Sequence, residues 1–278
     1  MITIKNKSYS GSNNRQSLID FDIPENFNGE IIVFVHGFMG FKDWGAWNLV
    51  HKFFTKNGFG FCKFNLSHNG GTIQNGIDFP DEESFGSNTY SKELNDVIFV
   101  LNWIEKQNIS YQKIHLIGHS RGGGIALLAA NMDTRISSVT SWAGISDIGS
   151  RFPSGKEREE WEISGVRYVQ NGRIKQNLPQ YYSLYEDFIH HQDKLNIGKA
   201  CEKLKIPTCI IHGSNDTSVA ISEGELNAKR LNVPLQIIEN ADHVFGASHP
   251  WNSNELPTNL KQVCEKTLEF LSLNDNHD

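Results

Sequence analysis

The chain has 278 residues, of which 38% are hydrophobic and 21% are charged, an ordinary composition for a globular protein with one large or two small cores. Its net charge of −6 and isoelectric point near 6.0 give no electrostatic reason to expect nucleic acid or an anionic membrane as a partner. The N-terminus lacks an apolar signal segment, and no long apolar run predicts a membrane span. We therefore expect a cytoplasmic protein.

The four cysteines are scattered through apolar surroundings, and their spacing does not match that of a zinc site. Without a secretory signal, we expect them to be reduced core residues. They are Cys62, Cys201, Cys209 and Cys264. The sequence contains no pattern that requires a metal ion or a cofactor, so we expect neither.

Apolar runs typical of buried strands alternate with helical patterns along most of the chain. The predicted strands lie at residues 31–35, 59–64, 114–117, 139–142, 209–211 and 235–238. The predicted helices lie at residues 44–58, 89–108, 122–132 and 259–271, the first of them with Asp43 as its N-cap. This alternation predicts one α/β domain over residues 1–278, with a mostly parallel sheet covered by helices on both faces. Ligands bind at the carboxyl ends of the strands in such sheets, so the site is expected there.

Two regions interrupt the alternation. Residues 66–88 form a long polar loop after a strand, and loops of this length are often functional. Residues 148–203 are predicted to be mainly helical, as an inserted cap. Their aromatic side chains either line a lid over the site or pack the insertion onto the sheet. These side chains are Phe152, Trp161, Tyr168, Tyr181, Tyr182, Tyr185 and Phe188.

The strand at 114–117 runs into the pattern G-x-S-x-G, formed by Gly118, Ser120 and Gly122. A serine on a sharp strand-to-helix turn points its hydroxyl clear of the backbone, and larger residues two positions to either side would collide there. A glycine-rich turn of this kind also suits phosphate binding, but these glycines match neither common phosphate-binding pattern. We therefore predict that Ser120 is a nucleophile.

A serine hydroxyl needs a base within hydrogen-bond reach, and a third group must orient that base. Of the eleven histidines, His243 lies just past the carboxyl end of the last predicted strand, where the base is expected. His249 follows in the same loop and is the second candidate. Three others lie in or next to strands in less suitable places, namely His115, His119 and His212.

The acid that orients the base is expected in the loop after the strand at 209–211, which carries Asp216. The chain order of Ser120, Asp216 and His243 matches the order of the three groups in α/β hydrolases. Asp242 competes for this role, but adjacent side chains usually point in different directions, which favours a turn role for it.

The oxyanion that develops during acyl transfer also needs hydrogen-bond donors. One is expected from the backbone N–H of Arg121, the residue after the nucleophile. The other is expected from the backbone N–H of Phe38, which follows His36-Gly37 at the end of the first predicted strand. The alternative is that Gly37 and Gly40 only shape a loop.

Together these segments resemble a serine hydrolase of the α/β-hydrolase superfamily. The chain is most similar to the branch that holds serine aminopeptidase-like and monoacylglycerol-lipase-like enzymes and the cinnamoyl or feruloyl esterases. The resemblance rests on "HGFMGFKDW" (36–44), "GHSRGG" (118–123), "HGSNDTSV" (212–219) and "ENADHVF" (239–245). It implies an α/β-hydrolase fold with an inserted cap at 148–203, a catalytic set of Ser120, Asp216 and His243, and oxyanion donors at Phe38 and Arg121.

One segment departs from the family pattern. Many relatives carry D-x-x-G-x-G-x-S after the corresponding strand, whereas this chain has "FNLSHNGGT" (64–72). We therefore expect an altered substrate mouth.

Three functions remain open from the sequence: a carboxylic ester hydrolase acting through an acyl-enzyme, an aminopeptidase, and a binding protein on a hydrolase scaffold. An aminopeptidase needs carboxylates near the cleft to bind a free amino group, and the candidates are Glu157, Glu159, Glu160 and Glu162. Their segment, "KEREEWE", is more simply a solvated helix. An intact Ser/Asp/His set argues against a pure binding protein.

The expected partner is a small-molecule ester, and nothing in the sequence specifies an oligomeric state. The aromatic residues of 148–203 favour an apolar or aromatic group in the cleft, and the loop 66–88 offers Phe79 and Phe85 as a wall. This predicts a moderately open site for short-acyl or aryl esters. The side chain of Arg121 either holds a substrate carboxylate or pairs with a neighbouring acid, and we expect the pairing.

Overall fold

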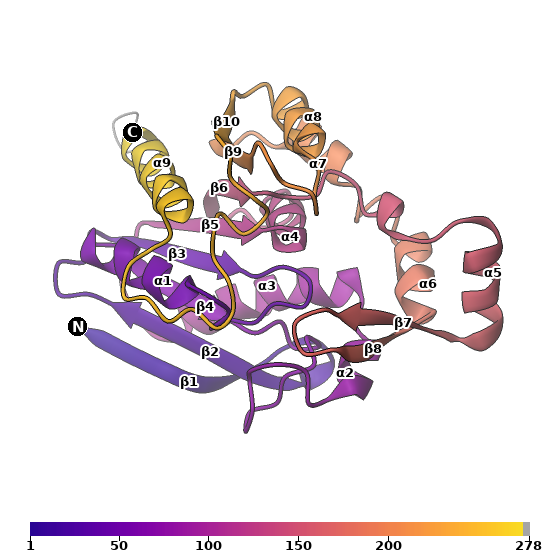
Figure 1. Ribbon diagram of the computed structural model, residues 1–278. Helices are drawn as coiled ribbons and strands as arrows, with labels where there is room; N and C mark the ends of the chain where they lie inside the picture. The colour runs from indigo at the N-terminus through magenta and orange to yellow at the C-terminus, as the bar shows by residue number, and fades with distance from the viewer. Residues whose placement is uncertain (275–278) are drawn as a thin grey trace.

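The structure is a computed structural model that describes residues 1–274, and its main feature is an eight-stranded sheet (Figure 1). The strands lie side by side in the order β1–β2–β4–β3–β5–β6–β9–β10. Both pairings of β2, with β1 and with β4, are antiparallel, and all pairings from β4 to β10 are parallel. The predicted α/β class and mostly parallel sheet are therefore confirmed. In chain order the strands are β1 (Ile2–Ser10), β2 (Gln16–Ile23), β3 (Glu30–Val35), β4 (Gly60–Phe64), β5 (Lys113–His119), β6 (Ile136–Trp142), β9 (Thr208–Gly213) and β10 (Leu235–Ile238).

Helices cover both faces of this sheet. In chain order, the helices of the described residues, including those of the inserted segment, are α1 (Trp47–Lys56), α2 (Glu82–Gly86), α3 (Tyr90–Glu105), α4 (Arg121–Ala130), α5 (Gly155–Ser164), α6 (Ser183–His190), α7 (Ile197–Lys203), α8 (Ile221–Leu231) and α9 (Thr258–Asn274). Short 3-10 turns, η1 and η2, lie at Ser12–Asn14 and Gly149–Arg151. Within residues 1–274, no helix is both long and apolar enough to span a membrane.

The core has two main apolar clusters, one on each face of the sheet. Alternate residues of β3 point to opposite clusters. Ile31 and Val33 belong to the cluster on the face covered by α3, α4, α7 and α8. Ile32 and Phe34 belong to the cluster on the face covered by α1 and α9. All four of these strand residues are fully buried or nearly so. A strand that is apolar on both sides is what a central parallel sheet requires, and it explains why these runs were predictable.

The two N-terminal strands were not predicted. Almost every residue of β1 is exposed, so the segment "ITIKNKSYS" has no apolar run to indicate a strand. It extends the sheet by pairing with β2 through backbone hydrogen bonds.

A second difference concerns Asp43, which was expected to cap a helix. The helix α1 begins later, at Trp47, and the Asp43 carboxylate instead pairs with Lys42 and Lys63.

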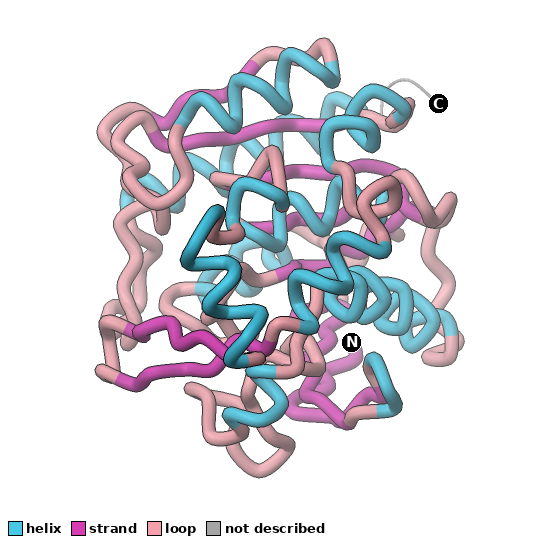
Figure 2. The backbone as a smooth tube through the Cα atoms, turned by 90° about the vertical axis from the view of Figure 1, so that its right-hand side faces the viewer, coloured by secondary structure: helices cyan, strands magenta, loops and turns pink. Residues whose placement is uncertain are grey.

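The expectation that residues 148–203 are mainly helical is wrong in part. The segment contains helices, but its centre is an antiparallel hairpin of β7 (Val166–Asn171) and β8 (Gln176–Tyr181) (Figure 2). Four residues, 172–175, connect these strands, and a short connection that contains a glycine is a recognised hairpin signal.

Most aromatic residues of this segment pack on one another and against the apolar cluster on the face of the sheet with α3 and α4, so they pack the insertion onto the domain. Phe152 contacts Tyr185 and Phe188 with ring centroids 5.1 Å apart, and it also contacts Tyr90 of α3. Phe79 and Phe85 were expected to form a wall of the cleft, but they are buried in a small cluster with Phe41 and Leu178. They attach the loop 66–88 to the hairpin instead.

The closeness of α4 to β3 generates a stability prediction. A methyl group at Gly122 would lie well inside van der Waals contact with the carbonyl oxygens of Val35 and His36, which are backbone atoms. We expect Gly122→Ala to lower the free energy of unfolding by roughly 1–3 kcal/mol in denaturant titrations. Gly172→Ala is the matched control, because nothing lies within 4 Å of its added methyl group. Equal losses in the two variants would contradict the prediction.

Candidate active site

Ser120 lies between the end of β5 and the start of α4, in a backbone conformation with φ 59° and ψ −123°. A positive φ is strained for a residue with a side chain, and such strain is common at functional sites. A methyl group at Gly118 would overlap the backbone of Gly122, and one at Gly37 would lie 2.8 Å from Cβ of Ser120. The predicted collision is therefore present, and the turn after β3 packs directly against the serine.

The structure brings together the three residues predicted as a catalytic set. The Oγ atom of Ser120 lies 2.9 Å from Nε2 of His243. The Nδ1 atom of His243 lies 2.8 Å from Oδ2 of Asp216. His243 and Asp216 come from the loops after β10 and β9, so all three groups meet at the carboxyl ends of parallel strands. This is the position expected for a ligand site in such a sheet.

Asp216 is held as a carboxylate by several donors. The backbone N–H groups of Ser218 and Val219 donate to its Oδ1 atom at 2.8 and 2.9 Å. Nε2 of the fully buried His212 lies 3.3 Å from Oδ2. Burial raises the pKa of the Asp216 carboxyl, but the hydrogen bonds from His212, His243 and Val219 outweigh it and hold this pKa well below its usual range. The charged form is therefore available to orient His243.

The competing acid and base lie in other arrangements. Asp242 is exposed, and its Oδ1 atom accepts backbone N–H groups of Val244 and Gly246 at 3.2 and 2.8 Å. It is a turn residue. His249 accepts the N–H of Gly45 at its Nδ1 atom, 2.8 Å away, and packs against Trp44. Its contacts support the loop that carries Trp44.

Two buried histidines hold the loops around the site. The Nε2–H group of His119 donates to the backbone oxygen of His243 at 2.8 Å. Burial, with a further contribution from His243, lowers the pKa of His119 to about 3. His36 donates from Nδ1 to the oxygen of Gly37 and accepts the N–H of Leu66 at Nε2, at 2.8 and 3.0 Å. Burial lowers the pKa of His36 to about 4, so both rings are neutral near pH 7.

Phe38 and Arg121 flank the serine as expected, and the two residues contact each other. Arg121 is the first residue of α4, so its N–H has no carbonyl partner within the helix. Its guanidinium pairs with Glu93 at 3.1 Å and stacks between the rings of Phe38 and Tyr90, 4.1 and 4.7 Å from their centroids. The Arg121 side chain is thus paired with a neighbouring acid, the arrangement expected from the sequence.

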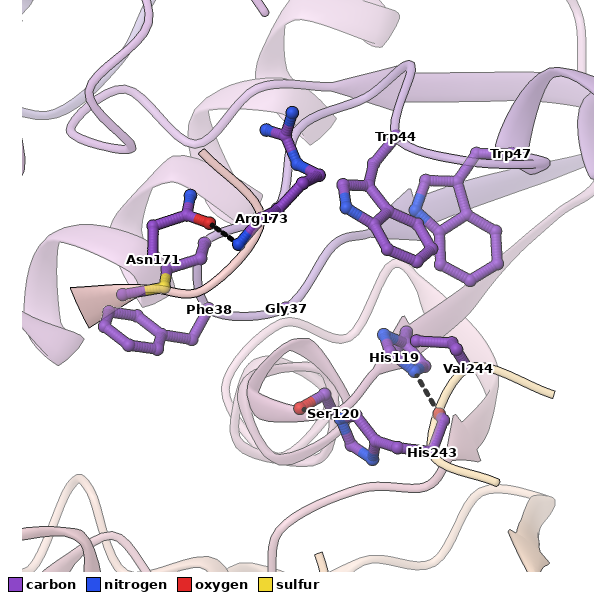
Figure 3. A pocket seen from close by; sticks show the side chains of 12 residues that line it. Gly37, Phe38, Trp44, Trp47, His119, Ser120, Asn171, Arg173, His243 and Val244 are labelled. Atoms are coloured by element: carbon purple, nitrogen blue, oxygen red, sulfur yellow. Dashed lines mark hydrogen bonds between the residues drawn. The ribbon is translucent and has the colours of Figure 1, made fainter. Parts of the chain in front are cut away.

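Ser120 and His243 line two cavities. The first has a volume of about 240 Å³ and is walled mainly by Phe38, Trp44 and Trp47 (Figure 3). The hairpin contributes Asn171 and Arg173 to it. Neither tryptophan was predicted as a lining residue, although Trp44 belongs to the "HGFMGFKDW" motif and Trp47 follows it. The aromatic wall therefore comes from the body of the domain rather than from the inserted segment.

The second cavity, of about 440 Å³, lies between the strand ends and the hairpin. Its lining includes Arg151, Arg167 and Gln180 from the 148–203 segment, none of which the sequence analysis identified. The four glutamates of α5 proposed as amine ligands are exposed and line neither cavity.

The departing stretch 64–72 supports the site from behind. Asn65 accepts the backbone N–H of Lys42 at 2.7 Å, and Asn69 donates to the oxygen of Gly40 at 3.1 Å. Ser67 is bound to the buried Asp96 of α3. This stretch lines neither cavity, and the altered substrate mouth stays a prediction.

Comparisons with known proteins agree on one fold. A family model described as the alpha/beta hydrolase fold matches residues 30–173. The monoacylglycerol lipase abhd6-B of Xenopus laevis is 25% identical over 90% of this chain and 78% of its own length. The uncharacterized peptidase YtmA of Bacillus subtilis is 29% identical over 46% of each chain. Est1E from Butyrivibrio proteoclasticus, solved with ferulic acid bound, superposes with a TM-score of 0.72 at 18% identity, over 95% of this chain and 97% of its own.

The neutral state of His119 predicts an acid-sensitive stability. The unfolded chain takes up a proton at this residue below a pH of about 6.5, while the folded protein resists protonation down to about pH 3. Stability contributed by His119 is therefore lost as the pH falls through this window. Between pH 7.5 and pH 5.0, we expect His119→Gln to lose about 2 kcal/mol less unfolding free energy than the wild type. Denaturant titrations at both pH values measure this, and an identical loss in both proteins would contradict it.

Proposed function

The chain belongs to the alpha/beta hydrolase fold family, and on this basis we propose that it is a serine hydrolase that cleaves carboxylic esters through an acyl-enzyme. In this proposal Ser120 is the nucleophile, His243 the general base and Asp216 the acid that orients it. The observation that carries the proposal is the continuous chain of contacts at 2.9 and 2.8 Å from Ser120 to Asp216, at a point that both cavities share. A monoacylglycerol lipase and an esterase among the similar proteins support ester chemistry.

The first half of the reaction forms the acyl-enzyme. Oγ of Ser120 attacks the ester carbonyl carbon while its proton passes to Nε2 of His243. The Asp216 carboxylate accepts the hydrogen bond from Nδ1–H and stabilises the imidazolium that results. The backbone N–H groups of Phe38 and Arg121 are proposed to donate to the carbonyl oxygen as it becomes negative. When the carbon–oxygen bond to the alcohol breaks, His243 returns the proton to the departing oxygen.

The second half of the reaction releases the acid. A water molecule takes the place of the alcohol, and His243 removes its proton as it attacks the acyl carbon. The bond to Oγ of Ser120 then breaks, and the serine recovers its proton from His243.

The first cavity supports a short acyl or aryl group as one part of the substrate. Its walls include the rings of Phe38, Trp44 and Trp47 and the side chains of Met39 and Val244. A cavity of about 150 Å³ is enough for a benzene ring, so the observed volume of about 240 Å³ suits an aromatic ring with a short extension. We propose that residues 148–203 act as a cap, because the hairpin contributes lining residues to both cavities.

Amide cleavage from a free amino terminus is less well supported. It requires a carboxylate to bind the ammonium group, and no aspartate or glutamate lines either cavity. A role as a binding protein without catalysis gives no reason for an intact Ser/His/Asp chain. The ester hydrolase is therefore the better proposal of the three.

Substitutions in the proposed catalytic set test the reaction type. We expect Ser120→Ala and His243→Ala each to lower kcat on the order of 10³-fold or more on a 4-nitrophenyl ester, because each removes a group that takes part in bond making. His249→Ala is the control, and its loss should be much smaller. Labelling with a fluorophosphonate probe, which requires Ser120, gives a readout independent of substrate choice. Retained activity in folded Ser120→Ala protein would end the proposal, and a larger loss from His249→Ala would reassign the base.

A series of 4-nitrophenyl esters tests the substrate class. We expect kcat/KM to fall for acyl chains longer than about eight carbons, because a small apolar cavity gains little from methylenes that it cannot enclose. Aminoacyl anilides assayed beside the esters should be poor substrates. A steady rise to the palmitoyl ester would indicate a lipase-like enzyme, and strong anilide cleavage with weak ester cleavage would indicate a peptidase.

A further inference from the structure

The second cavity beside Ser120 has an unusual balance of charge. Three arginines line it, Arg121, Arg151 and Arg167, and none of the aspartates and glutamates among the described residues does. Arg121 forms an ion pair with Glu93, and Arg151 forms an ion pair with Glu223. Within residues 1–274, Arg167 has no ion pair. The cavity therefore carries one positive charge that the protein leaves unmatched at short range.

Arg167 is held in place by neutral groups. Its Nε–H donates to Oε1 of Gln180 on the neighbouring strand at 2.9 Å. Its guanidinium lies over the ring of the buried Trp161, 4.4 Å from the centroid. Within residues 1–274, this guanidinium makes no second hydrogen bond to the protein, so its Nη1 and Nη2 donors are available to a ligand. A guanidinium fixed by stacking and one bond is preorganised to bind an anion with two parallel bonds.

The surroundings of Arg167 disfavour a bare positive charge. Partial burial lowers the pKa of the Arg167 guanidinium, the through-space effects of Glu157 and Tyr90 oppose this, and Arg121 lowers it further. Repulsion between Arg121 and Arg167 across a partly enclosed space is relieved when an anion lies between them.

Arg151 provides a second, independent sign of a missing partner. Its Nη2 atom pairs with Glu223, but its buried Nε atom has no hydrogen-bond partner. Buried donors in proteins are nearly always bonded, so the unpaired Nε–H leaves the Arg151 side chain, which lines the cavity, with unused hydrogen-bonding capacity.

We infer that this cavity is a subsite for a carboxylate of the substrate, with Arg167 as its main ligand and the Arg151 side chain as an additional donor. The inference rests on the proposed function, because the subsite matters only if an ester is cleaved at Ser120. It deepens that proposal: the substrate joins a short apolar or aryl part, in the first cavity, to a part that carries a carboxylate, in the second. A carboxylate matches the single unmatched charge, whereas a phosphate monoester would introduce a larger one.

The experiment uses two matched pairs of esters and the ratio of kcat/KM within each pair. Mono-4-nitrophenyl adipate and 4-nitrophenyl hexanoate differ by a carboxylate on the acyl side. The esters 3-acetoxybenzoate and 3-acetoxybenzamide differ by a carboxylate on the alcohol side. In one of the two pairs, we expect Arg167→Gln to lower the charged-to-neutral ratio by about tenfold or more, because a charge-assisted pair is lost. The pair that responds identifies which half of the ester occupies the second cavity.

Two further variants separate charge from structure. Arg158→Gln is the matched control, because Arg158 also stacks on an aromatic ring and bonds one neutral group, yet lines neither cavity. Its ratio should equal that of the wild type. Arg167→Lys keeps the charge and should retain a larger ratio than Arg167→Gln. A ratio unchanged by Arg167→Gln in both pairs, or lowered equally by Arg158→Gln, would overturn the inference.

A binding measurement distinguishes failure of the subsite from failure of the proposed function. Calorimetric titration of Ser120→Ala protein with monomethyl adipate needs no hydrolysis, and Arg167→Gln in that background should weaken the binding about tenfold or more. If the wild type cleaves none of the four esters but this binding is observed, the proposed function fails and the subsite stands. Tighter binding of methyl phosphate than of monomethyl adipate would overturn the assignment of a carboxylate.

Discussion

The geometry of the site depends on a close contact between three backbone segments, each of which has a glycine at or next to the point where they meet. The end of β3, the turn at Ser120 and the first turn of α4 approach so closely that a methyl group at Gly37, Gly118 or Gly122 would overlap a neighbour. At this close approach the serine adopts a positive φ, a conformation that is uncommon for residues with a side chain. The position of Phe38 follows from the same approach, since it is the residue next to Gly37.

Buried histidines connect this fixed turn to the loops that carry the other two groups. His119 bonds the backbone of His243, and His212 contacts the same Asp216 oxygen as His243 does. His36 links the turn after β3 to the stretch after β4. A neutral imidazole supplies one donor and one acceptor at fixed positions, so it joins two loops without placing a charge in the core. The polar groups around the serine therefore form one connected framework rather than separate contacts.

The features that could be predicted from the sequence are those that a local residue pattern indicates. The central strands are apolar on both faces, so their residues alone indicate them, and the glycines around Ser120 mark a turn with a special geometry. Ser120, His243 and Asp216 were brought together in the prediction by the rule that sites lie at strand ends. The rest depends on tertiary contacts. From its position in the sequence Asp43 resembles a helix cap, but in the fold it pairs with Lys42 and Lys63. No local pattern distinguishes Arg167, which lines the second cavity, from Arg158, which does not.

Arg121 has a consequence for how this protein tolerates sequence change. Its backbone belongs to the turn of the serine, while its side chain touches Phe38, Tyr90 and Glu93. The two proposed oxyanion donors, Phe38 and Arg121, are thereby joined through a single side chain and cannot shift independently. Strong epistasis is thus built in among these four positions: the effect of a substitution at Glu93 on α3 depends on which residues occupy 38, 90 and 121. Variation in a lineage of such proteins would be accepted at these sites as sets of compensating changes, while the outer face of the 148–203 segment diverges one residue at a time.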